Sequence, residues 1–544
     1  MWACVVFVVS IGVLGAGIEA AGIASAYSDP VSRMRAQDES MYVNCALSMT
    51  ADGDWLTPHF LNRPFFLKPP LLYWLSALSV KVFGPRLLAV RLPALLFGAM
   101  GCSIVFLWAA KTKNRTAGIF ACILLLSNAL WHTYSRLCYT DAIASGACMA
   151  AMYCLVSDST LRTWGARLGF GAATAVAIMT KHVAGVLPLV ALIGYCLVAG
   201  KEKRPPWRGV GVVLATAGLF VLPWHIFQLV VHPKWFWADY IQIQLLQAGM
   251  NPSPQFNSEP AIVFYLRRML LTDPILLALA VAALPGLLRA LRDRKSPTLL
   301  ILASWIFVVS LALLSFKSKN LPYIALMIPA LTVAAALCAP RLIAGRMGIA
   351  TAVLLALMGV KAIAGNYPWS LRFGSAPALP AAAPMSWYCR QHRANDLLLI
   401  EPDDEFSSAT LPLAHVRYVV FDPSGDVKRS APHLAFLGIT VTGNEFLELD
   451  RWLPVFRPRL REWGNPSTRA VATVITVRSE QDEVRLVEVH PHTDFYLPSK
   501  LLPLMPVGAM SAHTVVTLSG ERCFLLAKPQ DRRDVARLPA PCSW

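Results

Sequence analysis

The chain has 544 residues, of which 56% are hydrophobic and 15% are charged. Because soluble proteins carry about 25% charged residues, this composition excludes an ordinary soluble protein and predicts a polytopic α-helical membrane protein. The formal net charge of +17 does not indicate nucleic-acid binding. Much of the lysine and arginine stands in short connections between apolar segments, where the positive-inside rule places it.

A helix needs roughly 20 apolar residues to span a membrane. Apolar segments of about this length follow one another from Trp2 to Ile363. The first lacks a basic region at its start, so we interpret it as a retained helix and not as a cleaved signal peptide. A re-entrant pair is an alternative for two short segments, 168–180 and 183–200, and we expect about 11–13 spans in total. The spans are placed at 2–27, 87–109, 117–134, 141–157, 168–180, 183–200, 209–230, 262–288, 298–316, 321–339 and 347–364.

Every second connection between these spans is basic, and the positive-inside rule places the basic connections in the cytoplasm. They contain Lys111, Lys113, Arg115, Arg162, Arg167, Lys201, Lys203, Arg204, Arg208, Arg289, Arg292, Arg294, Lys295, Arg341 and Arg346. The other connections then face outward: 28–86, 135–141, 181–182, 231–261 and 317–320. The same parity places the C-terminal part outside. Within 28–86, residues 71–83 are apolar but too short to span, which predicts a helix lying in the membrane interface.

The character of the chain changes at about Asn366, where an Ala/Pro-rich linker (Ala376–Pro384) begins the C-terminal part. We divide the chain into a membrane domain, 1–365, and a soluble α/β domain, 366–544. Cys389, Cys523 and Cys542 lie in the second domain, where an oxidising compartment would permit a disulfide. Strands are predicted at Leu397–Ile400, Val416–Phe421, Ala472–Val477, Val484–Val489 and Thr514–Thr517, and helices at Met385–His392 and Asn444–Trp452.

Acidic residues stand at the outward ends of two apolar segments. Asp38 and Glu39 are adjacent in the first outer connection, and Asp141 begins another span. Charges beside membrane spans are functional candidates by default, so we assign these three residues to catalysis. The alternative is a helix cap, because aspartate favours the N-cap position and Ser40–Met49 has a helical pattern.

Cations stand in the same outward connections. The prolines after Lys68 fix an extended backbone, which holds this lysine in a stiff loop; a lysine snorkelling at the interface is the alternative. Lys181 interrupts an apolar stretch, at a cost unless it meets an anion or a water-filled cavity. We expect these cations to bind a phosphate or diphosphate headgroup, together with Arg136, Lys317, Lys319 and Tyr323.

Several familiar motifs are absent from the sequence. There is no P-loop, no dinucleotide-binding glycine pattern and no GxSxG elbow, and the histidines show no zinc-ligand spacing. Trp224-His225 is typical of an interfacial aromatic belt. Since a nucleotide-sugar donor would need a nucleotide-binding domain, we expect a donor that is already embedded in the bilayer.

The first outer connection resembles that of the bacterial lipid A aminoarabinose transferases, relatives of the protein O-mannosyltransferases. The resemblance is carried by Asp38-Glu39-Ser40-Met41-Tyr42, Gly53-Asp54-Trp55-Leu56-Thr57-Pro58 and Phe66-Leu67-Lys68-Pro69-Pro70-Leu71-Leu72-Tyr73-Trp74-Leu75. It implies a C-type glycosyltransferase fold in the bacterial inner membrane, with active site and C-terminal domain in the periplasm. Asp38 and Asp141 match family acids implicated in catalysis, and Lys68 matches the lysine that contacts the donor phosphate.

Three residues depart from the family pattern. Met41 stands where an arginine is usual, Leu67 where a glutamate is usual, and no aromatic hydroxyl occurs near Phe65. The glutamate is linked to a bound metal in the family, and the segment Gln242–Gln247 lacks the histidine expected beside it. A divalent metal is therefore an open question, as is the identity of the sugar.

The resemblance predicts an integral-membrane glycosyltransferase. Its donor would be a sugar on undecaprenyl phosphate, and its acceptor lipid A or another cell-envelope glycan. The alternatives are a transporter or flippase of lipid-linked sugars and an inactive relative that only binds partners. Transporters bind substrates near the membrane midplane between repeats, whereas the candidate charges here gather at one membrane face.

Overall fold

The computed structural model describes residues 1–15, 38–60, 63–84, 86–247 and 259–338 of the membrane part, and six strands between Leu397 and Ala527. The predicted span 347–364, the Ala/Pro-rich linker, both helices predicted after it and the strand Val484–Val489 lie outside the described residues.

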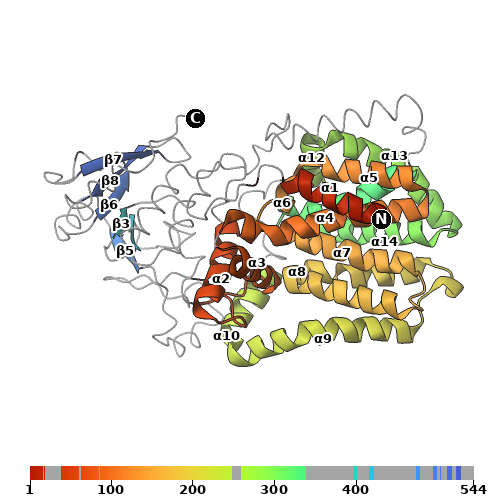
Figure 1. Ribbon diagram of the computed structural model, residues 1–544, viewed down its shortest axis with the longest axis horizontal. Coiled ribbons are helices and arrows are strands. Elements are labelled where there is room, and N and C mark those ends of the chain that lie inside the picture. The colour runs from red at the N-terminus through yellow and green to blue at the C-terminus, as the bar shows by residue number, and fades with distance from the viewer. Residues whose placement is uncertain are drawn as a thin grey trace.

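The described membrane part is helical almost throughout. Its elements are α1 (Trp2–Gly15), α2 (Asp38–Asp52), β1 (His59–Phe60), β2 (Arg63–Pro64), α3 (Leu71–Phe83), α4 (Leu87–Thr112), α5 (Arg115–Leu126), α6 (Ala129–Ser135), α7 (Thr140–Ser157), α8 (Trp164–Val198), η2 (Lys201–Lys203), α9 (Trp207–Val231), α10 (Pro233–Phe236), η3 (Trp237–Gln247), α12 (Ala261–Thr272), α13 (Pro274–Asp293), α14 (Pro297–Ser315), η5 (Leu321–Leu326) and α15 (Ile328–Cys338). Figure 1 shows α2, α3 and α10 gathered at one end of the long helices.

Six helices of the described part are long and apolar enough to cross a membrane, and the bent pair α5–α6 can be counted as a seventh. They include α4, α7, α8, α13 and α14, and a segment that joins η2 to α9. The prediction of a multi-pass membrane protein is confirmed. The first predicted span is described only as far as Gly15, where α1 ends.

Three of the predicted spans are interrupted where we expected continuous helices. Residues 117–134 divide into α5 and α6 with a 72° bend, because Asn128 caps a new helix by accepting a hydrogen bond from the Trp131 amide. Residues 262–288 divide at Asp273, which caps α13 through the Leu276 amide and precedes a proline. The side-chain amide of Asn128 donates a hydrogen bond to the Asp273 carboxylate at 2.7 Å, which links the residues at which these two spans are interrupted. Residues 321–339 begin as the short 3-10 helix η5.

Helix α8 folds back on itself at Lys181–His182. Both residues have non-helical backbone angles, and His182 has a φ of 24°. A Cβ added at Gly185 would overlap the backbone of Ala177 and Ile178, so the two arms meet directly after the turn. The arms 164–180 and 183–198 correspond to the two short spans that we predicted here.

The predicted interfacial helix is α3, which begins directly after Pro70. Tyr73, Ala77 and Val80 on one face are buried, whereas Leu78 and Val82 on the other face are exposed. The exposed side chains are therefore available to lipid, while the opposite face packs on the protein.

The C-terminal strands form one mixed sheet in the order β5-β4-β3-β6-β8-β7. The first four strands in this order are parallel to one another, and Leu397 lies opposite Val416 on one side and Asp494 on the other. Strand β8 pairs antiparallel with both β6 and β7. Parallel neighbours require crossover connections, which agrees with the predicted α/β class. The strands are β3 (Leu397–Ile400), β4 (Val416–Phe421), β5 (Thr473–Val477), β6 (Asp494–Pro498), β7 (Ser511–Val516) and β8 (Arg522–Ala527). The domain boundary at 365 stays a prediction.

Candidate functional site

A pocket that is partly open to its surroundings lies beside the turn of the α8 hairpin, with about 710 Å³ of space between its lining atoms and at its mouth. Its polar lining comes from the loop before α3, the turn of α8, η3 and η5: Lys68, Lys181, His182, Gln244 and Tyr323. Its apolar lining comes from the membrane-spanning helices α8 and α14 and from η5: Val183, Ala184, Leu187, Val309, Ala312, Leu313, Phe316 and Leu326. The same pocket is thus lined by charged groups and by apolar side chains.

Asp141 and Lys181 form a buried ion pair at this pocket. Asp141 stands in the first turn of α7, where the helix dipole stabilises a carboxylate. The Lys181 ammonium donates a hydrogen bond to the Asp141 Oδ1 atom, and their side chains are only 7% and 4% exposed. The same ammonium lies 4.9 Å from the centre of the Tyr323 ring. Three predicted site residues from distant segments therefore meet here.

Lys68 enters the pocket from a loop that is held on both sides. Pro69 and Pro70 follow it, and α3 begins directly after Pro70. Before it, the Phe66 amide donates to the Asp239 carboxylate at 3.2 Å. The Lys68 ammonium itself donates to the side-chain oxygen of Gln244 at 2.5 Å. Both acceptors belong to η3, which therefore sets the position of this lysine.

An aromatic cluster packs behind Lys68 and joins its loop to α9 and η3. It consists of Phe66, Trp224, Phe236 and Tyr240. The Phe66 ring lies 5.5 Å from that of Phe236 and 6.2 Å from that of Trp224, both edge to face. Tyr240 also meets the His182 ring at 5.3 Å. Trp224, predicted to belong to an interfacial aromatic belt, is buried in this cluster instead, because its indole finds a partner in the loop described next.

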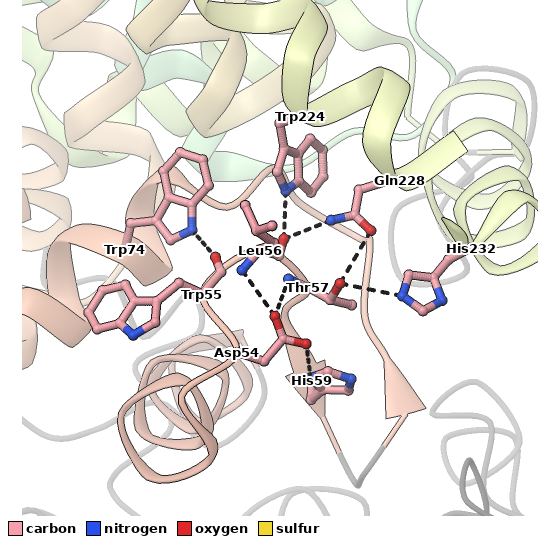
Figure 2. Close-up of polar contacts among 9 residues, drawn as sticks. All are labelled: Asp54, Trp55, Leu56, Thr57, His59, Trp74, Trp224, Gln228 and His232. Atoms are coloured by element: carbon pink, nitrogen blue, oxygen red, sulfur yellow. Dashed lines mark hydrogen bonds and ion pairs between the residues drawn. The ribbon is translucent and has the colours of Figure 1, made fainter. Parts of the chain in front are cut away.

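The loop from Asp54 to His59 is fastened between α3 and α9 (Figure 2). The Leu56 carbonyl accepts hydrogen bonds from Trp224 at 2.8 Å and from Gln228 at 2.7 Å. Trp74 donates to the Trp55 carbonyl at 2.5 Å. Within the loop, the Asp54 carboxylate accepts from the Leu56 and Thr57 amides. The Gly53-Asp54-Trp55 motif thus builds a turn that attaches the first connection to α9.

His232, at the end of α9, completes this attachment. Burial lowers its pKa, the neighbouring His59 lowers it further, and Asp54 acts in the opposite direction. Since the unperturbed value is about 6.5, His232 is neutral at pH 7. Its Nε2 atom lies 3.4 Å from the Thr57 hydroxyl.

Glu39, predicted to be catalytic, belongs to a fully buried ion pair away from the pocket lining. Its two carboxylate oxygens accept hydrogen bonds from Arg91 on α4 at 2.8 and 3.0 Å, and one also accepts from the Cys138 amide at 2.8 Å. Both side chains of the ion pair are 0% exposed. These contacts tie α2 to α4 and to the connection before α7, which suits a structural anchor.

The remaining predicted residues occupy other places. Arg136 is buried at the end of α6, Lys319 donates to the backbone carbonyl of Glu259, and Lys317 is exposed. None of these three lines the pocket. Asp38 begins α2, and its side chain lies outside the described residues.

Residues 67–227 match the family model described as dolichyl-phosphate-mannose-protein mannosyltransferase. An undecaprenyl phosphate-alpha-4-amino-4-deoxy-L-arabinose arabinosyl transferase of Aeromonas salmonicida (strain A449) is 30% identical over 301 residues, which are 53% of this chain and 52% of that protein. The protein of the same name from Pectobacterium carotovorum subsp. carotovorum (strain PC1) is 28% identical over 361 residues, 64% of this chain and 60% of that protein.

The fold has a solved counterpart. The crystal structure of ArnT from Cupriavidus metallidurans bound to undecaprenyl phosphate matches with a TM-score of 0.65, at 17% identity and over 99% of both chains. The chain is thus similar in sequence to the aminoarabinose transferases and to the protein mannosyltransferase family over part of its length. The fold match confirms the predicted C-type glycosyltransferase fold. The chain spans about half the length of the first curated relative that it matches.

The region matched by the family model contains Lys68, Asp141 and Lys181, whereas Gln244 and Tyr323 lie beyond it. Sequence reasoning missed Gln244, His182 and Arg91. His182 could have been found beside Lys181, since both interrupt the same apolar stretch. Nothing in the sequence pairs Gln244 with Lys68 or Arg91 with Glu39.

The divalent metal that the resemblance implies does not fit the described residues. Leu67 stands where the family usually has a glutamate, and within the described ranges no three His, Cys, Asp or Glu side chains are arranged to hold a metal ion. Segment 66–68 and η3 instead meet directly, through the hydrogen bonds to Asp239 and Gln244. The Lys68 ammonium at this place also repels a cation.

Proposed function

We propose that the chain is a glycosyltransferase of the bacterial inner membrane that moves a sugar from a polyprenyl-phosphate carrier to an acceptor at the periplasmic face. The acceptor class is lipid A or another envelope glycan. The observation that carries the proposal is the pocket itself, where two lysines lie beside an apolar wall from α8 and α14.

The two kinds of lining match the two parts of the carrier. A phosphate is recognised by charge-assisted hydrogen bonds from groups such as Lys68. A polyprenyl chain needs apolar surface, such as Leu313 and Phe316 provide. The names of the relatives and the undecaprenyl phosphate in the related crystal structure support this donor class.

In the proposed reaction an acceptor oxygen attacks the anomeric carbon of the sugar, and the bond from that carbon to the phosphate oxygen breaks. Negative charge develops on the departing carrier phosphate, so the larger catalytic term is its stabilisation by Lys68. Asp38 orients the acceptor and takes its proton if the acceptor is a hydroxyl. If the acceptor is an ionised phosphate, positioning suffices.

The Asp141–Lys181 pair has a supporting role in this proposal. A lysine already bonded to a carboxylate adds little net charge to the pocket, but it holds the α8 turn against α7 and Tyr323. Asp141 therefore fixes the position of the part of the pocket wall that the α8 turn forms.

Orientation and domain roles are part of the same proposal. The basic connections favour a cytoplasmic location for the ends of α4 and α7 at Lys113 and Asp158. The pocket, at the opposite end of α7, then faces the periplasm, and so does the domain 366–544.

Mass spectrometry of lipid A and other envelope glycans tests the function in a strain that lacks the gene. We expect a sugar mass to disappear, and to return with the wild-type chain or Lys113→Ala, an exposed change at the far end of α4. Lys68→Ala should be expressed without restoring it. Full restoration by Lys68→Ala would remove the phosphate-binding role, and movement of lipid-linked sugar without any transfer product would indicate a transporter.

A further inference from the structure

Two exposed tryptophans begin neighbouring helices at the end of the bundle opposite to the pocket. Trp164 begins α8 and is 64% exposed, and Trp207 begins α9 and is 78% exposed. The guanidinium of Arg167 lies 5.4 Å from the centre of the Trp164 ring, and that of Arg208 lies 5.5 Å from the Trp207 ring. These four residues and Arg204 form what we call the tryptophan–arginine surface. We propose that this surface binds the headgroup of an anionic phospholipid.

The two tryptophan–arginine pairs lie together because α8 and α9 pack side by side (Figure 1). A Cβ added at Gly209, in the first turn of α9, would lie 3.0 Å from the Leu161 carbonyl oxygen and 3.4 Å from the Nε atom of Arg167. Arg167 therefore lies between the Trp164 ring and the turn of α9 that Trp207 begins. One ligand can reach both helix starts.

The charge at this end of the bundle is strongly positive. Segments 158–167, 201–208 and 292–295 contain nine lysines and arginines and three aspartates and glutamates. The Lys203 ammonium donates to two backbone carbonyl oxygens of the third segment, at 3.0 Å each, which joins that segment to the connection before α9. Clusters of basic residues directly beside spanning helices attract anionic lipids.

The arginines are held in a way that suits a phosphate. The Nε atom of Arg167 donates to the Leu161 carbonyl at 2.6 Å, and that of Arg204 donates to the Ala199 carbonyl at 3.1 Å. Because Nε is bonded to the protein in both, the two terminal nitrogens of each guanidinium are the groups that would meet a ligand. A planar pair of N–H donors matches the oxygens of a phosphate.

The tryptophans indicate which source the phosphate has. Since α8 and α9 are long and apolar enough to cross a membrane, the side chains of their first turns lie at the level of the lipid headgroups. Tryptophan is enriched at this level because its indole combines an apolar ring with a polar N–H group. The indoles would pack against the glycerol and upper acyl region while the arginines bind the phosphate. A phospholipid fits both kinds of side chain.

A second basic connection at the same end provides a matched control. The Lys111 ammonium donates to the Ser157 carbonyl at 2.9 Å, so the connection between α4 and α5 lies beside the end of α7. Lys113 and Arg115 in that connection are exposed, whereas Trp108, the tryptophan that precedes them in the chain, is fully buried. These two residues supply charge without an exposed tryptophan beside them.

Native mass spectrometry of the detergent-purified full chain tests the inference, with cardiolipin as the anionic probe and phosphatidylethanolamine as the zwitterionic comparison. The wild type should bind cardiolipin in preference. The joint change Arg204→Gln and Arg208→Gln should weaken cardiolipin binding about tenfold or more, because two basic residues are lost. Trp207→Leu should weaken it as well, although the side chain stays apolar. Lys113→Gln with Arg115→Gln removes the same charge and should bind as the wild type does.

Several outcomes would overturn the inference. They are equal affinity of the wild type for the two lipids, wild-type cardiolipin binding by the Arg204/Arg208 variant or by Trp207→Leu, and an equal loss in the Lys113/Arg115 variant. The changed residues are exposed, and an unchanged gel-filtration profile shows that a variant is folded.

Lys68→Ala separates this surface from the pocket. It should leave cardiolipin binding unchanged, and a loss in this variant would show that the lipid binds at the pocket, which would also overturn the inference. Lipid binding is measured without sugar transfer, so the inference and the proposed function can each fail without the other.

Discussion

At the scale of single residues, the ion pairs of this chain have different environments and different consequences. Glu39 and Arg91 are fully buried and bonded twice to each other, whereas Arg267 and Glu259 pair at the surface. A surface pair contributes roughly 0–1 kcal/mol. Removal of one partner of a buried pair leaves an uncompensated charge and costs about 3–5 kcal/mol.

We therefore expect Glu39→Gln or Arg91→Met alone to lower the melting temperature of the detergent-purified chain strongly. The joint replacement of both residues by methionine should be less destabilising than either single change, because no buried charge remains. Fluorescence-detected size-exclusion chromatography after heating measures this. Single variants that melt like the wild type, yet lose sugar transfer, would contradict the anchor role and favour the predicted catalytic role of Glu39.

At the scale of elements, the α8 hairpin brings Lys181 and His182 to the pocket. The close approach of its arms depends on Gly185, where a Cβ would meet the backbone of Ala177 and Ile178. Backbone cannot move aside as a flexible side chain can. Overpacking of this kind typically costs about 1–3 kcal/mol.

Gly185→Ala should accordingly destabilise the chain and reduce donor binding, since the arms must separate and shift Lys181. Gly211→Ala in α9 is the matched control, because a Cβ there meets nothing within 4 Å. Alanine also raises helix propensity, so the control should melt at the wild-type temperature or slightly higher. Equal melting temperatures for the two variants would show that the arms are not closely packed in the membrane.

At the scale of the whole molecule, the proposed orientation follows from the charge of the connections. Lys113 and Lys317 are both exposed and belong to connections that we place on opposite sides of the membrane. The positive-inside rule places the connection at Lys113 in the cytoplasm, and the alternation of spans then places the connection at Lys317 outside.

Substituted cysteines test this orientation in intact cells. Lys317→Cys should react with a membrane-impermeant maleimide added outside, whereas Lys113→Cys should react only after lysis, each measured above the labelling of the parent chain. Labelling of Lys113→Cys in intact cells would invert the topology and place the pocket in the cytoplasm.

Properties that depend on short stretches of chain could be predicted from the sequence. The long apolar runs, the α3 helix after Pro70 and the strands β3 and β4 follow from local hydrophobicity and from proline and β-branched residues. The interruptions at Asn128 and Asp273 were missed. A capping residue inside an apolar run ends a helix only when its partner is in place, and here the two caps bond each other across 145 positions.

The sequence by itself determined that this is a membrane protein with acids and cations in alternate connections, because hydropathy and charge are properties of each segment taken alone. Only the tertiary structure decided which of these groups meet. Lys181 finds Asp141 across 40 positions, Arg91 finds Glu39 across 52, and Lys68 finds Gln244 across 176. The physical reason is that a buried charge must be compensated by whichever polar group packing brings near, and packing depends on the whole bundle.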